Sequence, residues 1–239
     1  MPKQKLPEEQ IDKEVEKLFK LNAHLGHKSN RIHPKAKKFI YRMEDGVSII
    51  DLVKTVALIN QAKKFVSQLA QNSKKLLFVA TKKNVAALTQ QICQANNLPY
   101  ITVKWPAGFL TNFETLLKNI KKLNKMREEK EKGSWSKFVK HEQLKLKKQL
   151  ARLNKFYAGV ASLDKLPDAI FVVDIKKEKT AIAEALKTRL PTIAIVDTNV
   201  NPENITYPIP ANDDSVEAVE YIIKEIVKAY TTVKKNSQS

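Results

Sequence analysis

Two pairs of side chains in this sequence have the chemistry of metal ligands. His24 and His27 form a His-x-x-His pair near the N-terminus, and Asp197 and Asp213 each follow a predicted late strand. Imidazole nitrogen and carboxylate oxygen together suit Zn²⁺, or Mg²⁺ where water completes the shell. These groups would converge if the segment around His27 folded over the carboxyl ends of the strands. The alternative is a direct hydrogen bond from His27 to Asp197 without an ion, and either arrangement would fix this segment against the domain.

The segment that follows these histidines is suited to binding phosphates. It has 6 cationic side chains between residues 28 and 42 and no acidic residue before the last of them. Such unbalanced charge favours contact with a nucleic-acid backbone over catalysis. The cations are Lys28, Arg31, Lys35, Lys37, Lys38 and Arg42.

A second cationic region extends over residues 113–157, where apolar residues recur at three- and four-residue steps and predict an inserted helical hairpin. Between Glu114 and Lys155 there are 14 Lys/Arg and 5 Glu, so 9 of the net 18 positive charges lie there. Gly133 and Ser134 interrupt the pattern where the hairpin would turn. We expect a self-contained apolar seam with a cationic surface for nucleic acid, against the alternative of a solvated lysine-rich pair. The seam residues are Phe113, Leu116, Leu117, Ile120, Leu123, Met126, Leu146, Leu150, Leu153 and Tyr157.

Other polar residues follow the predicted strands. Thr81, Lys82 and Lys83 lie at the start of a helix, where backbone N–H groups favour an anion, although an ordinary capped helix start fits equally well. Asp213 and Asp214 directly precede the last helix and suit N-capping. The further expected RNA contacts are Lys82, Lys83, Lys104, Trp105, Asn112, Lys118, Lys121, Lys122 and Lys125.

The motifs of nucleotide-dependent and nucleophilic enzymes are absent. The chain has 5 glycines and contains neither a GxGxxG nor a GxxxxGK[ST] loop, and no GxSxG motif. The single cysteine, Cys93, lies on the apolar side of a predicted helix and suits a small core residue, which excludes an intrachain disulfide and a cysteine-based zinc site. A Rossmann-like enzyme acting on RNA or nucleotides is the second hypothesis, without a visible catalytic group.

Strands that are apolar throughout alternate with helices after residue 75 and predict a parallel sheet covered on both faces. The expected strands are 76–80, 100–103, 169–173, 192–196 and 205–209, with helices at 83–97, 177–189 and 213–231. Before them we expect a helix over 8–22, a basic loop over 24–38, a strand hairpin over 39–50 and a helix capped by Asp51 that runs to about Asn72. The expected division is an α/β domain of residues 1–112 and 158–231, the hairpin insertion 113–157 and a polar, frayed tail 232–239.

The composition limits the classes of molecule that this protein could bind. The net charge of +18 and a pI of about 9.8 favour polyanions, while 43% apolar residues indicate a globular chain. No apolar run is long enough to span a membrane, and residues 1–20 lack the features of a signal or transit peptide. A peripheral membrane protein held by basic helices is disfavoured because no aromatic-rich amphipathic face accompanies the charge. We expect no membrane partner and no small-molecule substrate.

Seven sequence blocks together resemble the bacterial-type small-subunit ribosomal protein S2 family. They cover nearly the whole chain in the order typical of the family, although the family usually has a glycine where this chain has Ala107, which matters if the backbone there requires positive φ. The blocks are HLGH (24–27) with a downstream Pro-Lys (34–35), GVSIIDLVKT (46–55), LLFVATK (76–82), WPAGFLTNF (105–113), LPDAIFVVD (166–174), AIVDTN (194–199) and YPIPANDDS (207–215).

The resemblance implies a flavodoxin-like, Rossmann-like three-layer α/β/α sheet with a protruding coiled-coil hairpin. It implies a non-enzymatic constituent of the small ribosomal subunit that binds small-subunit rRNA beside neighbouring ribosomal proteins and, in bacteria, the large mRNA-binding protein S1. The expected location is a ribosome of the cytoplasm, with an organellar ribosome left open, and no cofactor is expected beyond the structural Zn²⁺ or Mg²⁺ considered above.

Overall fold

Five parallel strands form the main sheet of the protein, which a computed structural model describes for residues 8–236. The spatial order is β5-β4-β6-β7-β8, and all neighbouring strands are parallel. Counted along the chain, this is the order 2-1-3-4-5 of flavodoxin-like folds. The strands are β4 (Leu76–Val79), β5 (Tyr100–Ile101), β6 (Ala169–Val172), β7 (Thr192–Val196) and β8 (Tyr207–Pro210).

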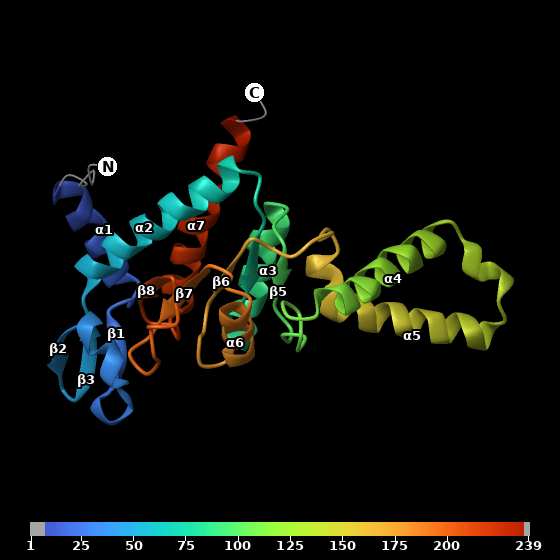
Figure 1. Ribbon diagram of the computed structural model, residues 1–239. Coiled ribbons are helices and arrows are strands. Elements are labelled where there is room, and N and C mark those ends of the chain that lie inside the picture. The colour runs from blue at the N-terminus through green and yellow to red at the C-terminus, as the bar shows by residue number, and fades with distance from the viewer. Residues whose placement is uncertain (1–7, 237–239) are drawn as a thin grey trace.

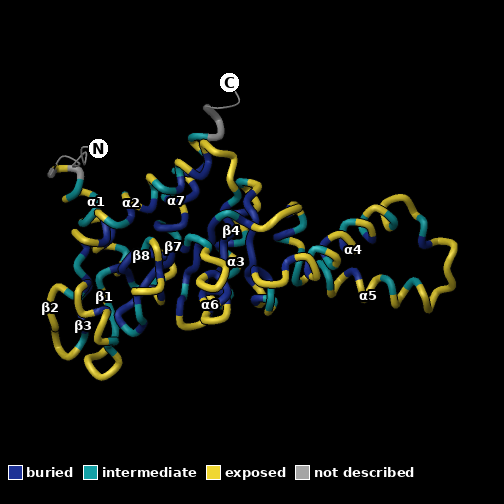
Figure 2. The backbone as a smooth tube through the Cα atoms, viewed as in Figure 1, coloured by how far each residue is buried: buried dark blue, intermediate teal, exposed yellow. Residues whose placement is uncertain are grey.

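Helices cover both faces of this sheet and give three layers (Figure 1). One face, which includes Phe78 and Phe171, packs against α1, α2, α3 and α7. The other face, which includes Leu77 and Val172, packs against α6, the start of α4 and the loop before it. The continuous apolar sequences follow from this double coverage, and the predicted α/β/α architecture is confirmed (Figure 2). The helices are α1 (Glu8–Lys20), α2 (Leu52–Gln71), α3 (Lys83–Ala95), α6 (Lys179–Lys187) and α7 (Val216–Asn236).

The predicted hairpin consists of α4 (Phe113–Glu131) and α5 (Lys140–Tyr157), which project from the main body (Figure 1). Its turn contains Gly133 with a φ of 67° and a short 3-10 helix, Ser134–Lys137. The distal seam packs around Leu123, Met126, Trp135 and Leu150.

The base of the hairpin differs from the prediction. Leu116 and Ile120 belong to the core that covers the main sheet, together with Phe113. A self-contained seam is therefore wrong for the first turns of α4, because these turns serve as a covering helix of the sheet.

A small antiparallel sheet precedes the main one and contains β1 (Leu25–Lys28), β2 (Ile40–Glu44) and β3 (Val47–Ile50) in the order β1-β3-β2. The predicted hairpin of β2 and β3 is confirmed, and its turn has positive φ at Asp45 and Gly46. The expectation of one long loop over 24–38 is wrong, since that segment contains β1 and two 3-10 helices, Ser29–Arg31 and Pro34–Phe39.

The remaining boundaries are close to those expected. The side chain of Asp51 accepts a hydrogen bond from the Lys54 backbone N–H at 3.2 Å and caps α2 as predicted. Helix α7 continues through Asn236, five residues into the expected tail 232–239, and the rest of that tail and residues 1–7 lie outside the described range. Among the described residues, no helix combines the length and hydrophobicity that crossing a membrane requires.

Candidate nucleic-acid interface

The small sheet is held against the end of the main sheet by Thr198, which follows β7. The backbone N–H of His27 donates to Thr198 Oγ1 at 2.9 Å, and the N–H of His33 donates to the Thr198 carbonyl at 2.8 Å. Ser48 Oγ donates to Thr198 Oγ1 at 3.1 Å. A Cβ atom at Gly26 would lie 2.5 Å from Ser48 Oγ and 2.7 Å from Thr198 Cγ2, so β1 approaches this closely only because residue 26 is glycine.

This docking presents the cations of residues 28–42 to solvent, and all six are exposed. Two have acidic partners: Lys35 pairs with Glu203, and Arg42 pairs with Glu44 at 3.0 Å. The other four have no acidic group within 4.0 Å among the residues described, so their charges are available to a phosphate. These four are Lys28, Arg31, Lys37 and Lys38.

A second cationic surface is a groove of about 580 Å³ at the base of the hairpin, between α4, α5 and the loop at residues 104–107. Lys104 and Lys122, both predicted RNA contacts, line this groove. Arg152 lines it from α5 and was not predicted, because α5 has several exposed cations and only the fold identifies those that face the groove. The rings of Phe156 and Tyr157 line the same groove and are half-buried, so the surface combines cations with aromatic faces, as single-stranded nucleic acids require.

The loop beside this groove is organised by Glu184 of α6, a buried carboxylate that sequence inspection missed. Its oxygens accept from Trp105 Nε1 at 3.1 Å, from the Gly108 backbone N–H at 2.7 Å and from the Leu110 N–H at 2.9 Å. Trp105 also lines the groove, but its side chain is buried and its N–H is used internally. The positive φ of this loop, 85°, lies at Gly108, so Ala107 replaces no glycine that the backbone requires.

Five further predicted contacts are exposed. Lys125 has an acidic partner in Glu129, at 3.9 Å, and Asn112 accepts a hydrogen bond from Thr115 Oγ1 at 2.9 Å. The hairpin and the small sheet lie at opposite ends of the molecule, so the cations of residues 28–42 and those of the hairpin form two separate surfaces (Figure 1). The five exposed contacts are Lys83, Asn112, Lys118, Lys121 and Lys125.

The crevice at which flavodoxin-like sheets bind ligands lies between β4 and β6. In this protein a buried carboxylate of the chain occupies it: Glu178 accepts from the Thr81 backbone N–H at 3.0 Å and also from the Thr81 hydroxyl. Burial raises the pKa of Glu178 above its usual value, against the effect of these hydrogen bonds. Lys177 Nζ donates to the Thr81 carbonyl at 2.8 Å. A carboxylate of the protein itself therefore binds the residue that precedes this helix.

Lys82 is directed inward, toward carboxylates that follow the neighbouring strands. Its Nζ donates to Asp213 Oδ1 at 2.8 Å and to Asp214 Oδ1 at 2.7 Å, and lies 3.9 Å from Asp174 Oδ2. Burial opposes the charge of Lys82, but the hydrogen bonds to both partners outweigh it and raise its pKa. Burial, together with the charges of Asp174 and Asp197, raises the pKa of Asp213 to about 6. Lys82 is thus engaged within the protein, in contrast to the RNA contact that the sequence suggested.

The sequence suggested Asp213 and Asp214 as N-caps of the last helix, and this prediction is wrong. Ser215 has that role, because its Oγ accepts from the Ala218 N–H at 3.3 Å at the start of α7. The backbone N–H of Asp214 instead donates to Asn212 Oδ1 at 2.9 Å, within the loop after β8.

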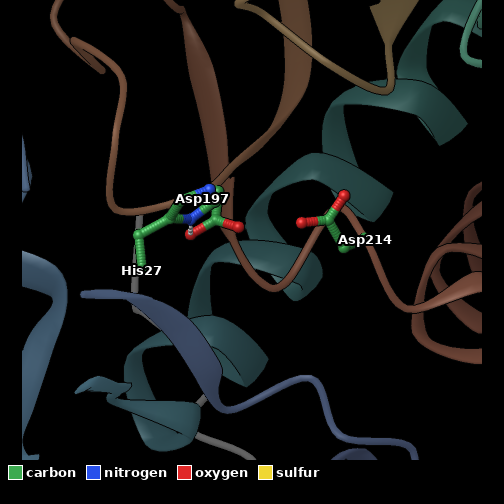
Figure 3. A group of neighbouring side chains, drawn as sticks. All are labelled: His27, Asp197 and Asp214. Carbon is green, nitrogen blue, oxygen red and sulfur yellow. Dashed lines mark ion pairs between the residues drawn. The ribbon is translucent and has the colours of Figure 1, made fainter. Parts of the chain in front are cut away.

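The predicted convergence of His27 and Asp197 is confirmed (Figure 3). His27 Nδ1 lies 3.1 Å from Asp197 Oδ1, and Asp197 is 1% exposed. The other two predicted ligands are wrong: the His24 ring stacks on Phe19 with centroids 4.1 Å apart, and Asp213 is bound to Lys82. Burial lowers the pKa of His24. The third group near His27 and Asp197 is Asp214.

Comparison with known proteins agrees with this fold and with the resemblance. The family model described as ribosomal protein S2 matches residues 18–232. The chain belongs to the ribosomal protein S2 family. A small ribosomal subunit protein uS2 of Karelsulcia muelleri is 38% identical over 218 residues, which cover 91% of this chain and 98% of that relative. A uS2 protein of Dehalococcoides mccartyi is 37% identical over 215 residues, covering 90% of this chain and 88% of the relative.

Proposed function

We propose that this protein is a structural constituent of the small ribosomal subunit that binds small-subunit rRNA through two separated cationic surfaces. The first consists of the exposed cations of residues 28–42, and the second is the groove with Lys104, Lys122 and Arg152. Their placement at opposite ends of the molecule supports the proposal, since two such contacts fix the orientation of a protein on a folded RNA (Figure 1). Its partners are then rRNA and neighbouring small-subunit proteins, with S1 among them in a bacterial ribosome.

An enzymatic role is less well supported. The crevice between β4 and β6 is the place for a nucleotide in this topology, and Glu178 places its own carboxylate there, on the Thr81 N–H that precedes α3. A phosphate in this crevice would meet that carboxylate. We therefore propose a binding protein without catalytic activity that acts on a ribosome, in the cytoplasm or in an organelle.

Binding to rRNA at a series of salt concentrations tests this function. If about six phosphates are neutralised, the logarithm of affinity should fall with the logarithm of salt concentration with a slope of about −4 on single-stranded and about −5 on duplex RNA. The variant Lys104→Ala/Lys122→Ala/Arg152→Ala should reduce the slope by roughly 2, because up to three fewer counterions are released.

The matched control removes three exposed lysines from the other helix layer, Lys13→Ala/Lys64→Ala/Lys228→Ala, and should leave the slope unchanged. Equal losses in the two triple variants would contradict a localised groove contact. A slope near zero with retained binding would contradict the electrostatic account altogether.

A further inference from the structure

The groove at the base of the hairpin combines positive charge with an apolar lining, and contact with phosphates alone does not require that lining. Its volume is about 580 Å³, and none of its lining residues is acidic. Phosphate oxygens bind charged and polar groups on an open surface, so an apolar hollow indicates that another part of the ligand enters it. The groove cations are Lys104, Lys122 and Arg152, and the apolar lining consists of Trp105, Pro106, Ala107, Leu153, Phe156 and Tyr157.

Two aromatic rings of α5 provide flat faces in this lining. Phe156 and Tyr157 are adjacent at the end of α5, and each is half-buried. The Tyr157 hydroxyl accepts a hydrogen bond from Asn119 Nδ2 at 3.4 Å, which links its ring to α4. Lys155 Nζ lies 5.9 Å from the centroid of the Phe156 ring, at the outer limit of a cation–π contact, and adds positive charge beside it. Aromatic faces flanked by cations are the surfaces on which unpaired bases stack.

From these features we propose that the groove holds one unpaired nucleotide of rRNA, with its base stacked on Phe156 and its flanking phosphates on the groove cations. This inference rests on the proposed function and specifies the kind of RNA that the second surface binds. The volume lies within the range of about 300–1,000 Å³ for small-ligand pockets, which suits a ligand of nucleotide size. Bases within a duplex are already paired and stacked, so a duplex offers the groove only its phosphates. The groove therefore favours a bulge or a loop over a continuous duplex.

Polar side chains of the groove can contact the edge of the inserted base. The amide of Gln149 and the hydroxyl of Thr180 line the groove and have no hydrogen-bond partner in the part of the chain that the structure describes. An amide both donates and accepts, so Gln149 can form hydrogen bonds to the edge of any of the four bases. The groove therefore selects a nucleotide for being unpaired and not for the base that it carries.

Hydrogen bonds fix both sides of the groove. Glu184 holds the loop beside the groove through Trp105 Nε1 and the Gly108 N–H. Within the hairpin, Arg127 of α4 donates to Asn154 Oδ1 of α5 from Nε at 3.0 Å and from Nη2 at 2.6 Å. A site whose sides are fixed in advance loses less conformational entropy on binding, so the base enters a groove that already exists.

Two RNA stems that differ in one base test the proposal with the full-length protein. Both are short stems closed by a non-nucleotide linker. One has a single bulged adenine, and the other has an abasic residue at the same position, so their phosphates are identical. The wild type should bind the adenine stem more tightly by a factor of roughly 5 to 150, which is the value of stacking one base. Fluorescence anisotropy of the labelled stems measures the two affinities.

Substitutions of Phe156 locate this preference in the groove. Phe156→Leu should bind both stems as the wild type binds the abasic one, whereas Phe156→Tyr should keep the preference for adenine. The matched control is Phe138→Leu, because Phe138 is a 46% exposed phenylalanine of the same hairpin that lies outside the groove. This control should retain the full preference, and circular dichroism verifies that each variant is folded.

Four results would overturn the nucleotide site. The wild type binds the two stems equally, or it binds neither, or Phe156→Leu retains the preference for adenine. The fourth is displacement of the adenine stem by a hexaglutamate peptide as effectively as by unlabelled stem, which would indicate an acidic polypeptide as the ligand. The comparison of the two stems needs no variant, so it decides the question even if Phe156→Leu does not fold. Phe156→Leu retains every groove cation, so loss of the nucleotide site leaves the salt dependence of rRNA binding, and with it the proposed function, in place.

Discussion

The buried carboxylate of Glu184 gives a prediction whose size follows from its contacts. It accepts three hydrogen bonds, from Trp105 Nε1 and from the backbone N–H groups of Gly108 and Leu110. Glu184→Ala leaves these donors without an acceptor at a site that is 8% exposed. At about 1 kcal/mol or more for each unsatisfied donor, the free energy of unfolding should fall by roughly 3 kcal/mol.

Glu184→Gln should have a smaller effect. The amide oxygen can replace Oε1, which serves two donors, while the NH₂ group faces the Leu110 N–H and loses that bond. The expected loss is about 1–2 kcal/mol. Urea unfolding followed by circular dichroism measures both variants, with Glu131→Ala at the exposed end of α4 as a control that should stay within about 0.5 kcal/mol. A loss below about 1 kcal/mol in Glu184→Ala, or a larger loss in the glutamine variant, would refute this reasoning.

Four further results are expected. Gly26→Ala should detach the small sheet and increase proteolysis of residues 24–50, because its Cβ would lie 2.5 Å from Ser48 Oγ. Unchanged cleavage would argue against close packing of β1 on the end of the main sheet. Deleting residues 128–149 and joining the ends with a short Gly/Ser linker should preserve cooperative unfolding. Deleting residues 114–155 should abolish it, because Leu116 and Ile120 are then missing from the core. Equal behaviour of the two deletions would show that the base of the hairpin is dispensable. Replacing Lys28, Arg31, Lys35, Lys37 and Lys38 together by Ala should weaken rRNA binding at an unchanged thermal midpoint, and full affinity would mean that these residues are only solvated. Because the pKa of Asp213 is raised from 3.8 to about 6 on folding, its protonation contributes at most about 3 kcal/mol to the free energy of unfolding. This contribution is fully present below pH 3.8 and is lost as the pH rises through about 6. Asp213→Asn should remove this pH dependence, and an unaltered pH profile of stability would exclude Asp213 as its source.

The parallel sheet could be predicted because the pattern that identifies each strand lies within the strand's own residues. Strands such as β6 and β7 are buried on both faces, so their continuous apolar runs between helices are sufficient to identify them. β1 could not be identified, because its sequence LGHK has no alternation and its position depends on contacts with Thr198, more than 170 residues later. The periodicity of α4 likewise indicates an apolar stripe without indicating its partner, which is the main sheet at Ile120 and α5 at Leu123.

The candidate sites likewise combine features that the sequence predicted with features that only the structure revealed. Residue types and charge predicted the cations of residues 28–42 and the pairing of His27 with Asp197. Choosing between Asp213 and Asp214 required the structure, since adjacent residues in a loop point in different directions and Lys82 determines which one is buried. Glu184 was missed because a glutamate in an amphipathic helix gives no sign that it faces a loop.

Sedimentation shows whether this protein is a component of the small ribosomal subunit. Tagged protein expressed at its natural level is followed through a sucrose gradient of cell lysate, with Lys104→Ala/Lys122→Ala/Arg152→Ala and the Lys13/Lys64/Lys228 alanine control in parallel. We predict that the wild type and the control migrate with small-subunit particles and whole ribosomes, and that the groove variant shifts toward the top of the gradient. Wild-type protein found only in the soluble fractions, with none in the small-subunit peak, would contradict the account.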